Sequence, residues 1–577
     1  MRLKLWLTSA ALLIAPLSAS PVTAGNVALK ALPAQLGPNA RAQYRAIFEN
    51  IHAARWQAAL AALDVMPEGP LHNVARAEIF LGKSSPRASA DGLLGLLKTA
   101  PELPQAYALA RLATARGATG LPSIPAEQDV NWLGSAPRRG HTQAADDAAR
   151  SGVAGRILSY IKTDQPAAAE LFLDGNSVSL NLDSLTEMRQ RIAWSYFLTG
   201  DDANARAMAA KAHSGSGEWA AQADWVSGLA AWRQRDYPAA ATQFLSAAQR
   251  ASNKEMVAAG YFWAARAAIN ANAPHAVEKY LRFAAQHGET FYGLLAQNAL
   301  GVKAAAVDDP TLARIPAVES LPNVRAALAL AEIGEHKLAD ALIRHQAKIG
   351  DGHDHAALAL LAGKLDLPAT QLWLAHNGPT GAVASVAARY PSPDNWQPAS
   401  GWRVDKSLMF AHALEESRFL TNAVSPAGAR GLMQVLPSTA AQIARKRGMT
   451  LGSLANPSTN MEFGQIFIEQ LRDRSETGGL LPKVIAAYNA GTLPIGVWNV
   501  KAGDGSDPLL YIESIPYWET RGYVTTVLRN YWMYQRQSGE ATVSMSALAQ
   551  GMWPRFPGLA GPAAVRIEPI NRLASAK

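Results

Sequence analysis

The chain has 577 residues, too many for one hydrophobic core, so its length predicts two to four domains. Hydrophobic residues make up 49% of the chain and charged residues only 17%; this balance favours closely packed helices over a β-rich sandwich and argues against disorder over most of the chain. The formal net charge of +8 favours an anionic partner such as nucleic acid, a membrane surface or an acidic polymer, or else a solvated basic surface.

The first residues are typical of a secretory signal peptide. A basic start precedes an apolar run from Leu5 to Leu17, and small residues follow up to Ala24, which predicts a signal at residues 1–24. The run is shorter than the roughly 20 residues that a membrane span needs. With no cysteine in the chain, there is no lipid-attachment site either. We therefore expect an exported, periplasmic protein without stable membrane insertion, and export argues against a nucleic-acid partner.

For residues 25–310 the sequence pattern predicts an α-superhelical domain. Turns that begin at Gly200, Arg235 and Asn270 are 35 residues apart, close to the period of a helix-turn-helix repeat of the TPR-like kind. Each pair can bury its apolar face only against its neighbours, so stacking produces a superhelix. An irregular helical domain with coincidental spacing is the alternative, and both interpretations are all-α. The segment from Gly117 to His141 interrupts the helices and predicts a long connection.

Further boundaries follow from composition. Residues 311–385 predict a smaller helical linker domain, and the proline-rich stretch 386–400 predicts a linker. Residues 401–536 form a distinct domain in which the motifs concentrate, and residues 537–577 form a C-terminal extension. The fold class is accordingly mainly α.

One glutamate stands out as a candidate acid. The run from Val404 to Leu420 predicts a buried helix, and Glu416 continues its apolar face through Met409 and Ala413. Because adjacent helical residues point about 100° apart, only one of Glu415 and Glu416 can face a given site. A carboxyl among apolar atoms has a raised pKa, as a general acid at neutral pH requires.

Four motifs give the domain a specific resemblance. Glu416-Ser417-Arg418-Phe419 precedes the glycine-rich run from Ser425 to Pro437, and two further motifs follow at Ala486–Gly491 and at Ile512–Val524. In this order, the four motifs resemble the lytic transglycosylases related to goose-type lysozyme, in particular the large soluble members with a superhelical domain. The resemblance implies that residues 401–536 form a lysozyme-like, mostly helical catalytic domain.

The resemblance also implies a role for each motif residue. Glu416 would act as the catalytic acid and then as the base. The other residues would bind substrate or support the site. Those that would line the glycan groove or position the sugar are Ser417, Gly431, Met433, Gln434, Tyr488 and Asn489, and those that would support the cleft wall or meet the peptide stems are Glu519, Arg521 and Tyr523. Purely structural roles remain open: Met433 as core, Tyr488 as a buried hydrogen-bonded tyrosine, and Glu519 with Arg521 as a local ion pair.

The reaction implied is cleavage of the β-1,4 bond between N-acetylmuramic acid and N-acetylglucosamine in peptidoglycan strands, with formation of 1,6-anhydro-N-acetylmuramic acid. No cofactor or metal is expected: His353 and His355 flank Asp354 without further ligands, and capping of a helix by Asp354 is the favoured interpretation. Two alternatives remain, a muramidase that hydrolyses the same bond and a non-catalytic repeat scaffold that binds peptidoglycan.

Overall fold

The computed structural model describes residues 34–140, 142–144, 152–302, 315–383, 385–501 and 505–568. The expected signal peptide lies outside these residues. Helices dominate the described part, and its named strands form two short antiparallel pairs: β1 (Asn131–Trp132) with β2 (Asn377–Gly378), and β3 (Trp553–Pro554) with β4 (Ala564–Val565). The predicted mainly-α class is confirmed. None of the described helices has the length and apolar character needed to cross a membrane.

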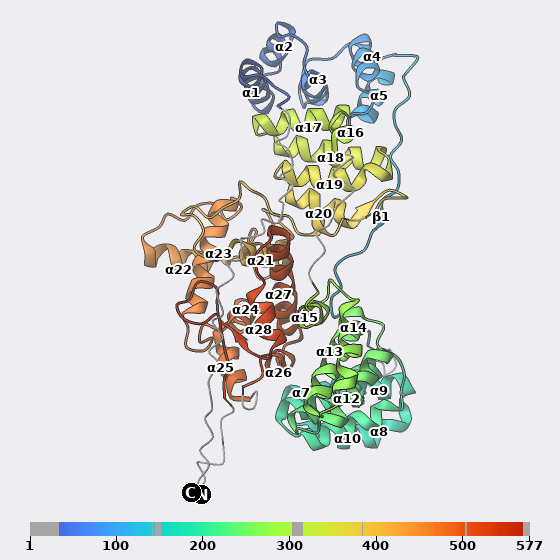
Figure 1. Ribbon diagram of the computed structural model, residues 1–577. Coiled ribbons are helices and arrows are strands. Elements are labelled where there is room, and N and C mark those ends of the chain that lie inside the picture. Colours follow the sequence, from blue (N-terminus) through green and yellow to red (C-terminus); the bar gives the residue numbers. More distant parts are fainter. Residues whose placement is uncertain are drawn as a thin grey trace, which may run out of the picture. The chain divides into compact units, whose positions relative to one another are not determined.

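Five helices form the N-terminal part of the described chain, and the first of them contacts a helix that comes nearly 300 residues later. The five are α1 (Pro38–His52), α2 (Trp56–Asp64), α3 (His72–Leu81), α4 (Ala90–Thr99) and α5 (Ala106–Ala115). Helix α1 packs against α17 (Pro322–Ile333), as Figure 1 shows. Glu332 of α17 accepts hydrogen bonds from the Gln35 backbone at 2.6 Å and from Arg41 Nε at 2.7 Å. The N-terminal part of the predicted superhelical segment thus packs on the predicted linker domain.

The segment predicted as a linker domain contains α16 (Ile315–Glu319), α17, α18 (His336–Ile349), α19 (His355–Lys364) and α20 (Pro368–His376). Between α5 and the next described helix, the chain is extended over most of residues 116–140, which we call the strap. Strand β1 of the strap pairs with β2, which follows α20, and the Gln128 backbone N–H donates to Lys348 O at 2.8 Å. The connection predicted from Gly117 onwards is therefore held by the linker domain.

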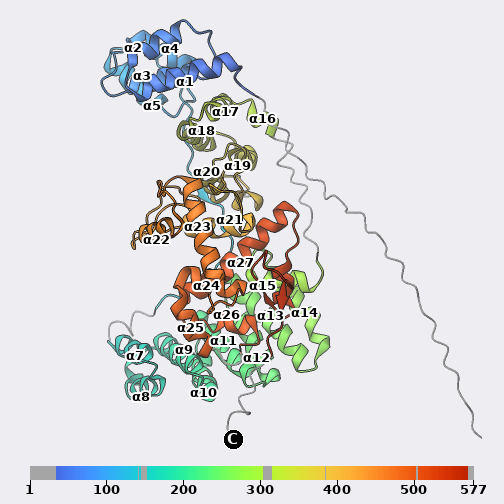
Figure 2. The same ribbon diagram turned by 90° about the vertical axis from the view of Figure 1, so that its left-hand side faces the viewer.

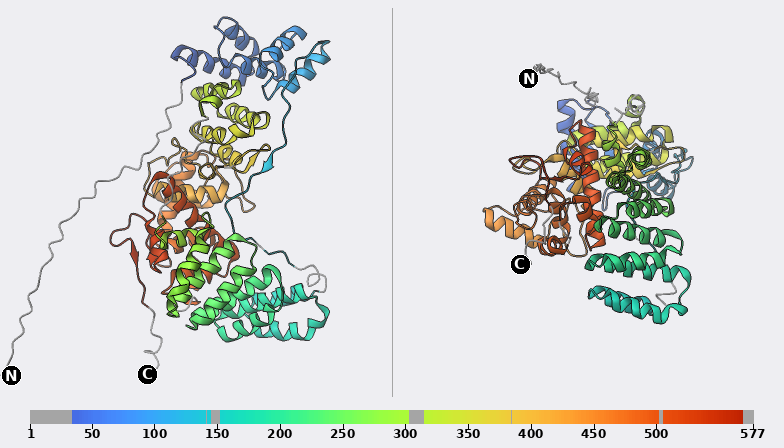
Figure 3. Two further views of the ribbon diagram at one scale, coloured as in Figure 1. Left: turned by 45° about the vertical axis from the view of Figure 1, so that its right-hand side comes forward. Right: turned by 60° about the horizontal axis from the view of Figure 1, so that its bottom comes forward.

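The helical stack that follows consists of α7 (Val153–Lys162), α8 (Pro166–Asn176), α9 (Leu182–Thr199), α10 (Asp202–His213), α11 (Gly217–Arg233), α12 (Tyr237–Arg250), α13 (Lys254–Asn270), α14 (Pro274–Ala285) and α15 (Phe291–Ala299). Consecutive helices pack on one another in chain order (Figure 3). The predicted turns occur, with positive φ at Gly200, Arg235 and Asn272. A Cβ on Gly228 of α11 would lie 2.6 Å from the Phe244 ring of α12, so glycine permits this close approach.

The remaining helices are α21 (Lys406–Ser417), α22 (Pro437–Arg447), α23 (Pro457–Arg472), α24 (Leu481–Ala490), α25 (Thr492–Lys501), α26 (Pro508–Glu513), α27 (Trp518–Ser538) and α28 (Val543–Ala549). Helix α15 of the stack lies beside α27 and α28 (Figures 1 and 2). Phe291 of α15 stacks on Trp532 of α27 with ring centroids 5.1 Å apart. One continuous apolar core therefore extends from the stack into these helices.

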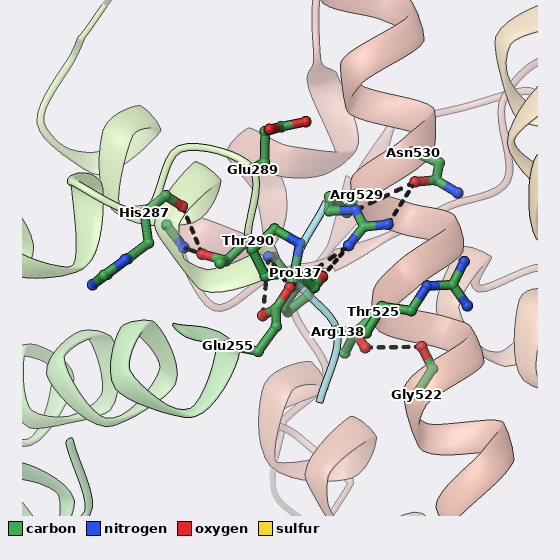
Figure 4. A network of polar contacts seen from close by, with 12 residues as sticks. Pro137, Arg138, Glu255, His287, Glu289, Thr290, Gly522, Thr525, Arg529 and Asn530 are labelled. Atoms are coloured by element: carbon green, nitrogen blue, oxygen red, sulfur yellow. Dashed lines mark hydrogen bonds and ion pairs between the residues drawn. The ribbon is translucent and has the colours of Figure 1, made fainter. Parts of the chain in front are cut away.

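A polar network crosses the same contact between α13, α15, the strap and α27 (Figure 4). Glu255 of α13 is buried and accepts a hydrogen bond from the Phe291 backbone at 3.1 Å, and burial raises the pKa of Glu255 to about 7. Arg529 of α27 lies 3.8 Å from Glu255 and donates to Pro137 O in the strap and to Asn530. These contacts fix α27, which carries part of the candidate site.

Candidate active site

Helix α21 carries Glu416 in its last turn. The helix begins after Asp405, whose carboxylate accepts from the Ser407 N–H at 2.8 Å and from the Tyr531 hydroxyl at 2.7 Å. Its residues from Ser407 to Leu414 are buried, as predicted for a helix enclosed on most sides. The helix ends at Ser417, earlier than the predicted Leu420, because Arg418 and Phe419 both adopt positive φ. Two consecutive non-glycine residues in this region are strained, so the surrounding packing enforces the turn directly after Glu416.

Glu416 is held by a hydroxyl from α27. The Tyr523 hydroxyl donates to Glu416 Oε1 at 2.6 Å. Burial raises the pKa of the Glu416 carboxyl to about 7; the nearby Glu415 and Glu519 raise this pKa further, whereas the Tyr523 hydrogen bond lowers it. A carboxyl with this pKa is substantially protonated at neutral pH, yet Glu416 keeps partial exposure. Glu416 can therefore deliver a proton to a bound molecule and then accept one.

A second residue of α21, His412, extends this chain of hydrogen bonds. His412 Nδ1 lies 2.8 Å from the Tyr523 hydroxyl, and burial lowers the pKa of His412 to about 3, so its ring is neutral. Because the single Tyr523 proton is donated to Glu416, His412 Nδ1 must carry the hydrogen that it shares with Tyr523. His412 lies one helical turn before Glu416, but its sequence context gave no indication of this role.

Glu415 points away from this arrangement. Arg138 of the strap binds the Glu415 carboxylate, with Nη1 at 2.8 Å from Oε1. The two adjacent glutamates thus have separate partners, as their positions on a helix require.

The loop after α21 is fixed by Asn460 of α23. Asn460 Nδ2 donates to Arg430 O at 2.8 Å and to Leu454 O at 2.9 Å, while Asn460 Oδ1 accepts from the Met433 N–H at 2.7 Å. A Cβ on Gly431, which has φ +72°, would lie 2.2 Å from Leu454 O. Glycine is therefore required at this position to let the loop approach α23. Nothing in the sequence pattern indicated the part played by Asn460.

Two predicted residues of this loop differ in exposure. Met433 is fully buried and packs against Gly464 of α23, where a Cβ would lie 2.8 Å from the Met433 side chain. Gln434 has φ +47° and is partly exposed, and its Nε2 donates to Gly431 O at 2.8 Å. Met433 therefore shapes the loop from beneath, whereas Gln434 reaches solvent.

Helix α24 brings Tyr488 and Asn489 to the same region. The Tyr488 hydroxyl donates to Met433 O at 2.6 Å, and its ring stacks parallel to the Tyr523 ring with centroids 6.5 Å apart. Asn489 Oδ1 accepts from the Thr520 hydroxyl at 2.6 Å. Tyr488 thus links the glycine-rich loop to the tyrosine that binds Glu416.

The remaining predicted residues are not all near Glu416. Ser417 is buried, and its hydroxyl donates to Ala413 O of its own helix. Glu519 is exposed and precedes Tyr523 by four residues, which places both on one face of α27. Arg521 precedes Tyr523 by two residues, about 200° around the helix, and packs against Trp194 of α9. Both Glu519 and Arg521 are among the described residues, and no ion pair is found between them.

The described residues contain no group of three or more histidine, cysteine, aspartate or glutamate side chains that could hold a metal ion. At the His353–His355 motif, Asp351 rather than Asp354 caps the short helix by accepting from the His353 N–H at 2.8 Å. His355 is buried, with Nε2 2.9 Å from Leu374 O. Asp354 occupies the N-cap position of α19, as expected, but its side chain makes no capping hydrogen bond there; the capping side chain is that of Asp351, at the start of the short helix.

Comparisons with known proteins agree with the motifs. Residues 395–509 match the family model described as the transglycosylase SLT domain. Over 156 residues, the chain is 32% identical to the soluble lytic murein transglycosylase of Escherichia coli K12, which corresponds to 26% of this chain and 24% of that protein. It is 35% identical over 119 residues to the membrane-bound lytic murein transglycosylase C of Histophilus somni 2336, covering 19% of this chain and 32% of that protein. The matched region thus spans about a quarter to a third of these relatives.

The similarity in fold extends further. The crystal structure of the 70 kDa soluble lytic transglycosylase from Escherichia coli has a TM-score of 0.51 and 17% identity to this chain, and the match covers 89% of this chain and 99% of that one. An inactive mutant of the lytic transglycosylase Slt from Pseudomonas aeruginosa has a TM-score of 0.50 and 20% identity, with 87% of each chain covered. The predicted resemblance to soluble lytic transglycosylases is confirmed, strongly for the matched domain in sequence and for most of the chain in fold.

Proposed function

We propose that this chain is a lytic transglycosylase that cleaves the β-1,4 bond between N-acetylmuramic acid and N-acetylglucosamine in peptidoglycan. One observation carries the proposal: Glu416, which lies within the residues that match the transglycosylase SLT domain, has a pKa of about 7 and accepts a hydrogen bond from Tyr523 at 2.6 Å. A general acid is most effective when its pKa lies near the working pH, and the Glu416 carboxyl meets this condition.

In the proposed reaction, Glu416 protonates the oxygen that bridges the two sugars, and the bond between this oxygen and C1 of N-acetylmuramic acid breaks. The N-acetyl group stabilises the cationic sugar. The ionised Glu416 then takes the proton of the C6 hydroxyl, whose oxygen bonds to C1 and closes the 1,6-anhydro ring. The proton given is recovered and no water is consumed. A single carboxyl is sufficient, unlike in glycosidases that use a carboxyl pair.

The hydrogen bond from Tyr523 suits the second half of this cycle. A hydroxyl that donates to a carboxylate stabilises its ionised form, which exists after the proton has been transferred. Burial favours the protonated form, so the two effects oppose each other and keep the Glu416 pKa near neutrality. We assign His412 a positioning role, because the hydrogen on its Nδ1 directs the Tyr523 proton towards Glu416.

We further propose how the other motif residues serve the glycan strand. The partly exposed side chains of Gln434, Tyr488 and Asn489 and the exposed Glu519 would contact substrate. The remaining three motif residues near Glu416 would shape the site beneath the strand: Ser417, Gly431 and Met433. The partner proposed is thus peptidoglycan, and the location proposed is the periplasm, reached through the signal predicted at residues 1–24.

The decisive measurement is the mass of products released from purified sacculi by the pure protein. A transglycosylase gives anhydro-muropeptides, which are one water lighter than the products of a muramidase. The Glu416→Gln variant should release neither product, because an amide can neither give nor recover the proton. Full lysis by Glu416→Gln would remove Glu416 from the mechanism, and absence of lysis by the unmodified protein would favour a peptidoglycan-binding scaffold.

A further inference from the structure

The strap presents an arginine to the residue next to the proposed acid. Arg138 Nη1 lies 2.8 Å from Glu415 Oε1, and Arg138 Nη2 donates to Glu415 Oε2, so both oxygens of the carboxylate are bound. A planar guanidinium that meets a carboxylate in this way forms a pair of defined geometry. Glu415 directly precedes Glu416 on α21, so this ion pair lies beside the candidate acid.

The backbone around Arg138 is fixed by three helices. Asn253, the N-cap residue of α13, donates from Nδ2 to Arg138 O at 2.8 Å. Arg529 of α27 donates to the preceding carbonyl, Pro137 O (Figure 4). The next residue, Arg139, pairs at 2.6 Å with a buried carboxylate at the end of α26. The strap is irregular, yet these contacts hold Arg138 in one place relative to α21.

Few charges act on the Glu416 carboxyl. The titratable groups that face it come from α21, α24 and α27 and are His412, Glu415, Tyr488, Glu519 and Tyr523. Burial lowers the pKa of the histidine to about 3 and raises the pKa of both tyrosines well above its usual range, so these three are uncharged at neutral pH. The charged groups among these described residues are therefore the two glutamates.

The two glutamates differ in how strongly water screens them. Glu519 is exposed, whereas the Glu415 side chain is only 14% exposed. Both raise the pKa of Glu416, and Glu415 has the larger effect, as expected for the less screened charge. A guanidinium bound to both oxygens of Glu415 opposes this effect, because the pair has no net charge. Arg138 is the group that occupies this position.

We propose that Arg138 is a positioning residue for the proposed reaction, which balances the charge beside Glu416 by neutralising Glu415. This inference rests on the proposed function of Glu416. It differs from a role in anchoring the strap, because the strap is also held by the pairing of β1 with β2 and by the ion pair of Glu127 with Lys348. A segment from the N-terminal half of the chain thus contributes a charge to the Glu416 site.

The two partners of the pair should have opposite effects. Arg138→Met leaves Glu415 uncompensated, so the decline of kcat/KM at high pH should move up by about half a unit, roughly threefold in proton affinity. Glu415→Gln leaves Arg138 unpaired and should move the decline to lower pH by a similar amount. The double variant Arg138→Met/Glu415→Gln should lie near the unmodified protein. Lys348→Met is the matched control, since it also removes an ion pair of the strap, and it should leave the decline in place.

The measurement is kcat/KM for the release of soluble fragments from purified sacculi across the neutral pH range, because this quantity reports the acid of the free enzyme. A purely structural role of Arg138 would lower the rate without moving the decline, and Glu415→Gln would not restore it. An unmoved decline in Arg138→Met, or movement in the same direction in both single variants, would overturn the proposal. Should Arg138→Met not fold, the downward movement in Glu415→Gln carries the test.

A measurement without turnover separates this inference from the proposed function. Glu416→Gln is added to each background, and urea unfolding is compared at pH 4 and pH 8. A higher pKa of Glu416 in the folded state makes this residue more destabilising as pH rises. The gain in stability from Glu416→Gln at pH 8 should therefore be larger in the Arg138→Met background and smaller in the Glu415→Gln background than in the unmodified protein.

The two sets of results fail independently. Absence of anhydro products, together with these differences in stability, would refute the proposed reaction and leave the charge balance standing. Anhydro products from the unmodified protein, together with equal gains in all backgrounds, would refute the role of Arg138 alone.

Discussion

The protonation of the Glu416 carboxyl depends on Tyr523 and His412, neither of which needs to contact the substrate. His412 Nε2 is buried and has no hydrogen-bond partner among the described residues, so the ring is kept at a cost to stability, on the order of 1–3 kcal/mol. A residue that costs stability and binds the hydroxyl next to the proposed acid fits a functional rather than a structural role.

Replacing His412 with phenylalanine should therefore separate activity from stability. We expect a kcat about tenfold lower, since one hydrogen bond is worth roughly 0.5–1.5 kcal/mol, and a midpoint of thermal unfolding that is equal or higher. Without His412, the Tyr523 hydroxyl is no longer directed at Glu416 and lowers the Glu416 pKa less. The pKa of Glu416 therefore rises, and the decline of activity at high pH should move to higher pH. His412→Gln, which can keep an N–H donor, should recover part of the rate; equal losses in both variants would contradict this role.

The raised pKa of Glu416 also predicts how the stability of the protein depends on pH. Its pKa is about 7 in the folded protein against an ordinary 4.5, so the folded state binds more protons between these pH values and loses stability as pH rises through them. Glu416→Gln should be as stable as the unmodified protein below pH 4.5 and more stable above pH 7, by on the order of 2 kcal/mol. Urea unfolding at pH 4 and pH 8 measures this; a difference independent of pH would refute the raised pKa.

Helical spacing predicted that Glu416 lies on the apolar face of its helix, but only the resemblance of the surrounding motifs implied a catalytic role for it. The sequence could not predict His412 or Asn460, since their importance comes from partners 111 and 27 residues away in the chain, Tyr523 and Met433. A histidine on an apolar helix and an asparagine near a helix start carry no pattern that identifies such partners.

At the scale of elements, the strap joins parts that the sequence separates. Its partly buried Arg139 donates to both oxygens of the buried Glu513, at 2.6 and 3.2 Å, and the Tyr292 hydroxyl also donates to Glu513. Glycines and prolines predicted an irregular connection here, but not its partners, because extended chain has no periodicity that reveals what it contacts. The helix pairs were predictable because their turns repeat.

Arg139→Met should strongly destabilise the chain, because it leaves the fully buried Glu513 without its cation; loss of such a partner costs about 3–5 kcal/mol. The neighbouring Arg138 is the matched control, since its pair with Glu415 is about half exposed on the arginine side. Arg138→Met should cost less than about 1 kcal/mol. The shift of the urea midpoint measures the destabilisation in both variants. The double variant Arg139→Met/Glu513→Leu should regain most of the stability lost in Arg139→Met. Equal shifts for the two arginine variants would contradict this role of the strap.

In the whole molecule, the apolar core is divided differently from the predicted domains. The core of α7–α15 continues into the helices around Glu416, whereas no residue of α1–α5 belongs to it and α1 packs on α17. Composition and turn spacing showed where helices lie but not which helices share a core, since α1 and α17 are nearly 300 residues apart and both look like ordinary amphipathic helices.

This division predicts which core residues matter for activity. Phe291 and Phe48 are both fully buried, but only Phe291 belongs to the core that includes α27, where it stacks on Trp532. Either change to alanine should destabilise its own core by about 3–5 kcal/mol. Phe291→Ala should also lower the rate of sacculus digestion, because α27 positions Tyr523 beside Glu416, whereas Phe48→Ala should leave the rate unchanged at temperatures where the chain stays folded. If Phe48→Ala reduced the rate as much, the helices around Glu416 would depend on the N-terminal helices as well, and the two cores would act as one unit.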